Sequence, residues 1–258
     1  MNGEWILPAT AVGLVGGTLV GLTGVGAGSV IAAFLLVFYP ELSAKLIVGS
    51  ATAQAAVMKL FGVLARRHMK LGETRLGLAM AAGAAPLAIA GAWASHTLHG
   101  NVLRSILAYV LAAVGMLLVA QAVHRWGTGR AHAVAERDRA AARVGVIGAV
   151  VGFIAGLTSI GTGTLFVSAL AGPLRVDAHR AVAAALVAGL VTLVISAATH
   201  IALGHAQAAL VFGTCLGSVP GVLLGTAFAT RLPARALRGL IGAGIVVAAM
   251  IALVRLRA

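Results

Sequence analysis

Two short stretches rich in glycine and hydroxyl side chains nearly repeat each other, and their residue types are suited to binding chemistry. Both read Gly-Leu-Thr-x-x-Gly-x-Gly; the first begins at Gly21 and the second at Gly156, 135 residues later. Each motif lies inside an apolar run that is too long for one ordinary helix. Because glycine permits the backbone to leave helical geometry, we predict that the helix breaks at each motif.

A helix break of this kind can create a site for an anion. We expect a new half-helix to start near Gly28 in the first copy and near Gly163 in the second. A helix N-terminus presents free N–H groups and a partial positive charge, and hydroxyl side chains add further donors. If the two ends meet, they form one anion site near the membrane midplane. The predicted substrate-binding residues of the motifs are Thr23, Gly24, Gly26, Gly28, Ser29, Thr158, Ser159, Gly161, Thr162, Gly163 and Thr164.

The glycines that precede each motif have a different interpretation. Gly13 and Gly17 in the first copy, and Gly148 and Gly152 in the second, follow the Gly-x-x-x-Gly spacing. This spacing is typical of closely packed membrane helices, so we predict a packing role for these four residues. A nucleotide site is not indicated, because no lysine follows the glycines and no strand with an acidic partner accompanies them.

Two further kinds of residue are candidates for the site. Lys59 is the one ionisable residue deep within an apolar segment. It either pairs with an anionic substrate or extends about 10 Å along its helix to the interface near Arg66, and the sequence leaves both interpretations open. Most histidines lie at segment ends, where no special role is expected. His68 and His200 occupy matching positions in the two halves, so they are the better candidates for proton coupling.

The ionisable residues also limit the class of function. No carboxylate lies within an apolar segment, and Cys215 is the single cysteine. We therefore expect no metal site and no cofactor. Neither a paired-carboxylate arrangement nor a Ser/His/Asp set occurs inside a segment, so the protein is not expected to be an enzyme.

Composition indicates an integral membrane protein. Of the 258 residues, 60% are hydrophobic and 10% are charged, whereas soluble domains carry about 25% charged residues. The nineteen Lys and Arg residues outnumber the six carboxylates, and they cluster between apolar runs. Such clusters are the positive-inside signature of a multi-span protein, so we expect a multi-pass protein of the cytoplasmic (inner) membrane and no nucleic-acid partner.

The apolar segments form two homologous sets of four. Residues 1–124 and 144–258 are two repeats joined by a basic cytoplasmic linker, residues 125–143. Proline, glycine and Leu-Arg positions match between the sets with an offset of 132 to 135 residues. The predicted fold class is therefore all-α, and each repeat opens with a Gly-broken helix or a re-entrant hairpin. The segments are Ile6–Phe38, Ser43–Ala65, Leu76–Thr97, Val102–Val123, Val144–Leu170, Ala181–Leu203, Ala206–Ala229 and Ala234–Val254.

Loop charge bears on whether the two repeats are parallel or inverted in the membrane. If the first segment of each repeat enters and returns, the repeats are inverted; if it crosses, they are parallel. The inverted arrangement places fourteen loop cations inside and four outside, against eleven and seven for the parallel one. The positive-inside rule favours inversion, as a bias that leaves the parallel arrangement open.

Several of these residues resemble one known family. The doubled glycine motif, the run from Gly217 to Gly225, and the sequence Arg231-Leu232-Pro233-Ala234-Arg235 are similar to the TauE/SafE family of sulfite and organosulfonate exporters. The resemblance covers nearly the whole chain. Here Gly26-Ala27-Gly28-Ser29 and Gly161-Thr162-Gly163-Thr164 stand where family members often have three consecutive glycines. The resemblance implies transport of small sulfur-containing anions across the cytoplasmic membrane of a prokaryote.

The sequence therefore predicts a secondary transporter that moves a small anion by alternating access. Sulfite, a sulfonate or another sulfur-containing oxyanion is the expected substrate, and the expected partners are this anion and the lipid bilayer. A homo-oligomer stays open. Two alternatives also remain: a membrane scaffold or accessory subunit whose glycines only pack helices, and an anion channel.

Overall fold

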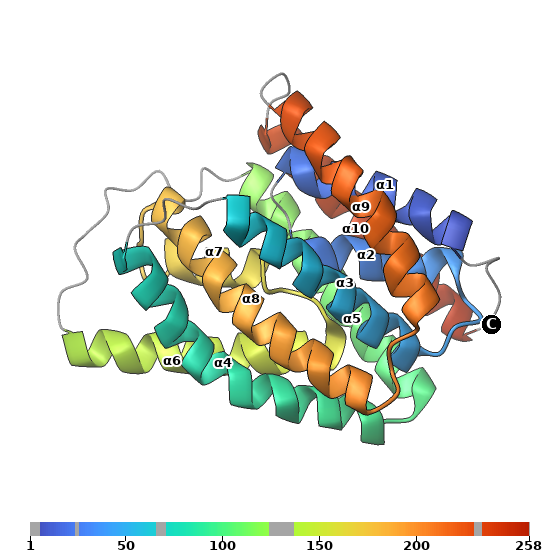
Figure 1. The fold of residues 1–258 in the computed structure, drawn as a ribbon, viewed down its shortest axis with the longest axis horizontal. Coiled ribbons are helices and arrows are strands. Elements are labelled where there is room, and N and C mark those ends of the chain that lie inside the picture. The colour runs from blue at the N-terminus through green and yellow to red at the C-terminus, as the bar shows by residue number, and fades with distance from the viewer. Residues whose placement is uncertain (1–5, 24–25, 66–70, 124–136, 230–233, 258) are drawn as a thin grey trace.

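The described residues of the computed structural model, 6–23, 26–65, 71–123, 137–229 and 234–257, fold into ten helices (Figure 1). An all-helical chain is suited to a bilayer, because a helix satisfies its backbone hydrogen bonds within one segment. The helices are α1 (Ile6–Thr23), α2 (Ala27–Phe38), α3 (Ala44–Ala65), α4 (Leu71–Thr97), α5 (Gly100–Val123), α6 (Arg137–Thr158), α7 (Thr164–Ala171), α8 (Ala178–Ala202), α9 (Ala208–Ala229) and α10 (Ala234–Arg257).

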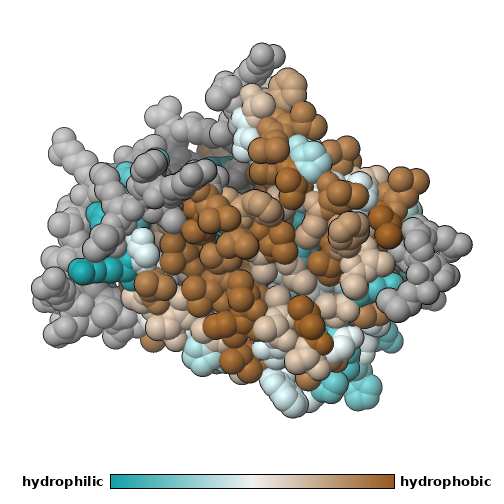
Figure 2. Space-filling model, viewed as in Figure 1, coloured by the Kyte–Doolittle hydropathy of each residue, from teal (hydrophilic) through white to brown (hydrophobic). Residues whose placement is uncertain are grey.

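Six of these helices are long and apolar enough to cross a membrane: α3, α4, α5, α8, α9 and α10. Their outer faces are apolar as well, and large side chains such as Val123, Phe212 and Leu240 are mostly exposed. Figure 2 shows a continuous hydrophobic region over the centre of one face of the molecule. A water-soluble monomer rarely exposes so large an apolar surface, so the prediction of a multi-pass membrane protein is confirmed.

Both predicted helix breaks are present. The predicted segment Ile6–Phe38 holds two helices, since α1 ends at Thr23 and α2 begins at Ala27. The predicted segment Val144–Leu170 likewise divides into α6, which ends at Thr158, and α7, which begins at Thr164. Helix α7 starts next to Gly163, as expected, and α2 starts at Ala27, one residue before the expected Gly28. Helix α6 begins at Arg137, inside the predicted linker, because its first turns are polar and carry no apolar signal.

Helices of residues 1–124 pair with helices of residues 144–258. Helix α1 lies along α9, α6 along α4, α5 along α10, and α3 along α8 (Figure 1). Every one of these pairs takes one member from each half of the chain. The two halves are therefore interleaved, and neither forms a core by itself.

Glycines make the closest of these helix contacts possible. A Cβ placed on Gly13 would lie 2.2 Å from the Thr214 carbonyl oxygen, and one on Gly17 would lie 2.5 Å from that of Ser218. The other half is matched, because a Cβ on Gly148 or Gly152 would lie 2.2 Å from the carbonyl oxygen of Met80 or Ala84, respectively. The predicted packing role of all four glycines is confirmed.

We expect Gly152→Ala to destabilise the protein, because its methyl group meets backbone that cannot move without separating α6 from α4. Overpacking of this kind costs about 1–3 kcal/mol. Gly145→Ala is the matched control in the same helix, since a Cβ there has no atom within 4 Å. Thermal unfolding in detergent should show a lowered Tm for the first variant and an unchanged or slightly raised Tm for the second. Equal Tm values would contradict the packing role.

Candidate functional site

The two glycine motifs meet in the interior of the protein. A Cβ placed on Gly28 would lie 2.2 Å from the carbonyl oxygen of Ser159, and one placed on Gly26 would lie 3.1 Å from the Gly163 nitrogen. The two breaks are therefore in backbone contact across the molecule. At Gly28 only a residue without a side chain permits this approach, and at Gly26 a side chain would be tight, which explains these two glycines of the first motif better than helix packing does.

The second break has an unusual backbone. Ser159 has φ 64° and Gly161 has φ 104°, and a non-glycine residue in the left-handed region is uncommon. The Ser159 N–H still donates to the Ala155 carbonyl at 2.7 Å, but the Ile160 N–H donates at 3.3 Å to the hydroxyl of Thr158. The helix therefore ends here, and strained backbone of this kind concentrates at functional sites.

Three hydroxyl groups at the junction are buried and have no hydrogen-bond partner among the residues that the structure describes. They belong to Ser29, Ser159 and Thr164, which are 1%, 0% and 5% exposed. Leaving a buried polar group unpaired costs about 1–3 kcal/mol. Neither the start of α2 nor the start of α7 has a side-chain cap. The junction thus combines two uncapped helix N-termini with hydroxyls that are available to a ligand.

The hydroxyl of Thr158 is used differently from what the motif suggested. It donates to the Ile154 carbonyl one turn earlier, at 2.6 Å, and it also accepts the N–H of Ile160. Its bonds therefore serve to terminate α6. Thr162 is buried at 3% exposure, and Thr23 is the last residue of α1. Gly24 lies outside the described residues.

Lys59 points into the protein and toward the second break. Its side chain is 8% exposed. A Cβ placed on Gly189, near the middle of α8, would lie 3.1 Å from the Lys59 Nζ and 3.4 Å from the Cβ of Thr162. Of the two interpretations that the sequence left open, extension to the membrane interface does not match this geometry. Gly189 provides the space for the ammonium, and nothing in its apolar sequence surroundings marked it for this role.

No carboxylate of the described residues is placed to neutralise Lys59. Those residues contain Glu41, Glu73, Asp138 and Asp177, and each of these four either precedes a helix or falls in its first turn. Lys59 is instead in the interior of α3, six residues before the end of that helix. A cation at such a depth normally pairs or marks a substrate path, and the junction beside it offers hydroxyl and N–H donors rather than anions.

Other buried polar residues connect helices near the junction. The Gln54 side-chain nitrogen donates to the Ser218 hydroxyl at 2.9 Å, which links α3 to α9. The Gln54 side-chain oxygen and the Ser196 hydroxyl are buried without a partner. His200 is completely buried, and its Nε2 lies 2.8 Å from the carbonyl oxygen of Gly156 at the start of the second motif. His68, the other candidate for proton coupling, lies outside the described residues.

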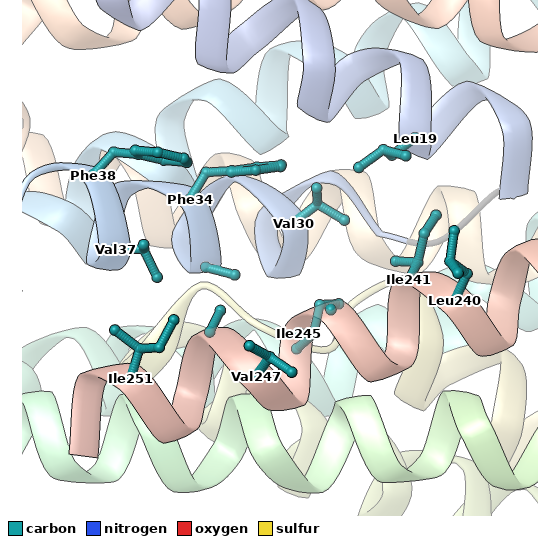
Figure 3. A pocket seen from close by; sticks show the side chains of 13 residues that line it. Leu19, Val30, Phe34, Val37, Phe38, Leu240, Ile241, Ile245, Val247 and Ile251 are labelled. Carbon is teal, nitrogen blue, oxygen red and sulfur yellow. The ribbon is translucent and has the colours of Figure 1, made fainter. Parts of the chain in front are cut away.

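An apolar pocket elsewhere in the protein is not suited to an anion. This pocket of about 300 Å³ lies between α2 and α10, next to α1. Figure 3 shows that side chains such as Phe34, Ile245 and Ile251 line it. All of its lining residues are apolar or glycine, so it contains no side-chain group that could replace the hydration of a charged ligand.

Comparison with known proteins places the chain in a family. Residues 9–252 match the family model described as "Sulfite exporter TauE/SafE". The chain belongs to the TauE/SafE family. This TauE/SafE protein is also similar to the "Probable membrane transporter protein YjnA" of Bacillus subtilis (strain 168), with 28% identity over 247 residues, covering 93% of this chain and 96% of that protein. No solved structure matches it.

These matches confirm the resemblance that the motifs carry. The family model describes an exporter and the relative is named as a transporter. The TauE/SafE protein is accordingly a membrane transporter and not an enzyme.

The contact between the two breaks can be tested by adding a methyl group to either glycine. We expect Gly28→Ala to lower the Tm markedly, because its methyl group would meet the Ser159 carbonyl oxygen at 2.2 Å. Gly26→Ala should have a smaller effect, since the Gly163 backbone at 3.1 Å needs to shift by only a few tenths of an ångström. Thermal unfolding of both variants in detergent provides the measurement. A larger loss for Gly26→Ala would contradict the geometry.

Proposed function

We propose that this protein is a secondary transporter that binds a small oxyanion at the junction of its two helix breaks. The observation that carries the proposal is the contact between the two breaks beside the Lys59 ammonium, with three buried and unpartnered hydroxyls at the junction. This arrangement supplies donors and positive charge, and none of the described carboxylates competes for them. The proposed site consists of residues 23–29, residues 158–164 and Lys59.

A small oxyanion matches these donors chemically. Its oxygens are acceptors only, so each can receive a hydrogen bond from a hydroxyl or a backbone N–H at a helix N-terminus. One ammonium can balance one negative charge, and a charge-assisted bond of this kind is about twice as strong as a neutral one. The family description names a sulfite exporter. We therefore propose sulfite, a sulfonate or another sulfur-containing oxyanion as the substrate, carried across the cytoplasmic membrane.

We further propose that the two repeats, residues 1–124 and 144–258, are inverted in the membrane. Support comes from which helix ends lie together. The His96 and His205 rings, near the C-terminal ends of α4 and α8, are joined at 3.0 Å. At the opposite ends of these two helices, a Cβ on Gly72 would lie 3.7 Å from the Arg180 guanidinium. Helices α4 and α8 therefore run in the same direction.

The shared direction of α4 and α8 helps to distinguish the two topologies. If the repeats were parallel, these two helices would cross the membrane in opposite directions, which does not agree with their contacts. In the inverted arrangement, the α6–α7 hairpin enters and returns to the side from which it came. Gln121 lies near the C-terminal end of α5, and its side chain donates at 2.6 Å to the hydroxyl of Ser168 in α7. Helix α7 therefore comes back to the end of α5, which agrees with a hairpin that returns to its own side.

Inverted repeats offer a simple route to alternating access. Each hairpin would approach the junction from its own side of the membrane, so movement of the two hairpins relative to each other would expose the site to one side at a time. Because α1 packs on α9 and α6 on α4, each hairpin would move together with a helix of the other repeat.

Lys59→Met tests the binding role of the ammonium. Loss of a charge-assisted interaction of about 1.5–3 kcal/mol should raise the KM for radiolabelled sulfite in proteoliposomes about 10- to 100-fold. Gly189→Ala, which displaces the ammonium but keeps its charge, should have a smaller effect. Gly62→Ala is the control, since its Cβ makes only an ordinary contact with Leu186 at 3.4 Å. An unchanged KM for Lys59→Met would overturn the binding role, and flux that never saturates would favour a channel.

Cysteine labelling tests the inverted arrangement. A cysteine in place of Ser43 should react with an impermeant reagent from outside the cell, and one in place of Ala178 should react only from the cytoplasmic side. Native Cys215 is replaced by serine in both variants. Reaction of both introduced cysteines from the outside would contradict inversion and restore the parallel arrangement.

A further inference from the structure

Three histidines from different parts of the fold form a continuous chain that reaches the second helix break. His96 Nδ1 lies 3.0 Å from His205 Nε2, and His205 Nδ1 lies 3.2 Å from His200 Nδ1. His200 Nε2 then lies 2.8 Å from the carbonyl oxygen of Gly156. The chain runs inward, since His96 is exposed, His205 is 5% exposed and His200 is completely buried.

The inner end of this chain is determined by the break itself. In an uninterrupted helix the Gly156 carbonyl would accept the N–H of Ile160. That N–H is turned instead to the hydroxyl of Thr158, so the carbonyl needs another donor. His200 supplies it, and its Nε2 must therefore carry a hydrogen, because a carbonyl oxygen can only accept.

This one constraint sets the tautomer of every neutral ring in the chain. With its hydrogen on Nε2, neutral His200 accepts at Nδ1. His205 must then donate from its Nδ1 and accept at its Nε2, and His96 must donate from its Nδ1. All three hydrogen bonds point inward, and the remaining acceptor is Nε2 of the exposed His96.

Burial and the charges around His205 favour a neutral ring at this position. Burial lowers the pKa of His205, and the neighbouring His96 and the Lys45 ammonium of α3 lower it further. The same ammonium donates to the backbone carbonyl of His96. Toward the inner end, α6 contributes the negative end of its dipole, at the Gly156 carbonyl that His200 contacts.

We propose that His96, His205 and His200 form a proton relay that loads one proton onto His200 when the substrate anion binds. A proton from water binds His96 Nε2, the His96 Nδ1 proton passes to His205 Nε2, and the His205 Nδ1 proton passes to His200 Nδ1. The His96 and His205 rings end neutral in their other tautomers, and His200 ends as an imidazolium. One proton enters and one positive charge is gained beside the second break. The relay rests on the proposed function, since the charge acts on an anion at the junction.

The inner end of the relay lies in the same motif as two of the unpartnered hydroxyls. Ser159 and Thr164, with their unpartnered hydroxyls, follow Gly156 within eight residues. A cation bonded to the Gly156 carbonyl therefore lies at the last turn of α6, three residues before Ser159 in the sequence. Binding of the anion and binding of the proton are then mutually favourable, and linkage requires each to strengthen the other by the same factor.

The experiment measures methanesulfonate binding to purified protein in detergent as a function of pH. A sulfonate stays ionised throughout, so any proton taken up belongs to the protein. For the wild type, we expect uptake of up to one proton per bound anion, recorded with an indicator dye in weak buffer, and a Kd that rises by up to about tenfold per pH unit between about pH 5 and 7, where the Lys59 ammonium stays charged. His200→Gln keeps a donor for the Gly156 carbonyl but cannot be protonated, so its Kd should not vary with pH over this range. The control is His99→Gln, which changes an exposed histidine that is not part of the relay and should behave as the wild type.

Three results would overturn the relay while leaving the proposed function intact: anion binding by the wild type without proton uptake, a His200→Gln variant that still takes up a proton, or nitrogen NMR that places the resting hydrogen of His200 on Nδ1. The NMR measurement requires no ligand. If the wild type binds neither methanesulfonate nor sulfite, the proposed function itself fails.

Discussion

Unpaired backbone groups are costly in lipid, and this constraint governs the arrangement of the whole protein. A helix that breaks within the membrane exposes N–H and C=O groups that lipid cannot satisfy, so the break must be covered by protein or must face a wet cavity. Here both breaks are brought together. The first has no side chains at Gly26 and Gly28, where the backbone of Ser159 and Gly163 lies against it. The outer helices surround this contact and close it from the lipid.

The helix pairing follows from the same requirement. To bring both breaks to one place, α1 and α6 must each pack closely along one face, and the glycines at every fourth position let α9 and α4 approach that face. At the second break, the residues that lose helical partners are satisfied individually: Thr158 accepts an N–H and His200 donates to a carbonyl. The unpartnered hydroxyls of Ser29, Ser159 and Thr164 are the exception, and they lie where we propose that the anion binds.

Much of this organisation could be predicted from the sequence, because it depends on patterns with a local cause. Apolar length predicts the spanning helices, glycine density predicts the breaks at residues 24–26 and 159–163, and Gly-x-x-x-Gly spacing predicts the packing of Gly13 and Gly152. Contacts between distant segments have no such local signal. Nothing in the sequence around Gly189 marks it as the space for Lys59, and His96 and His205 look like ordinary histidines at segment ends until the fold aligns them with His200.

The most direct test of the account is the position of a bound anion. Selenite has the shape and charge of sulfite, and its selenium can be located by anomalous scattering in crystals of the protein. The account predicts a selenium peak at the junction of the two breaks, within hydrogen-bonding reach of the hydroxyls of Ser29, Ser159 or Thr164 and on the side that faces Lys59. A reproducible selenite site elsewhere, with the junction empty at saturating selenite, would contradict the central claim that the two breaks together form the anion site.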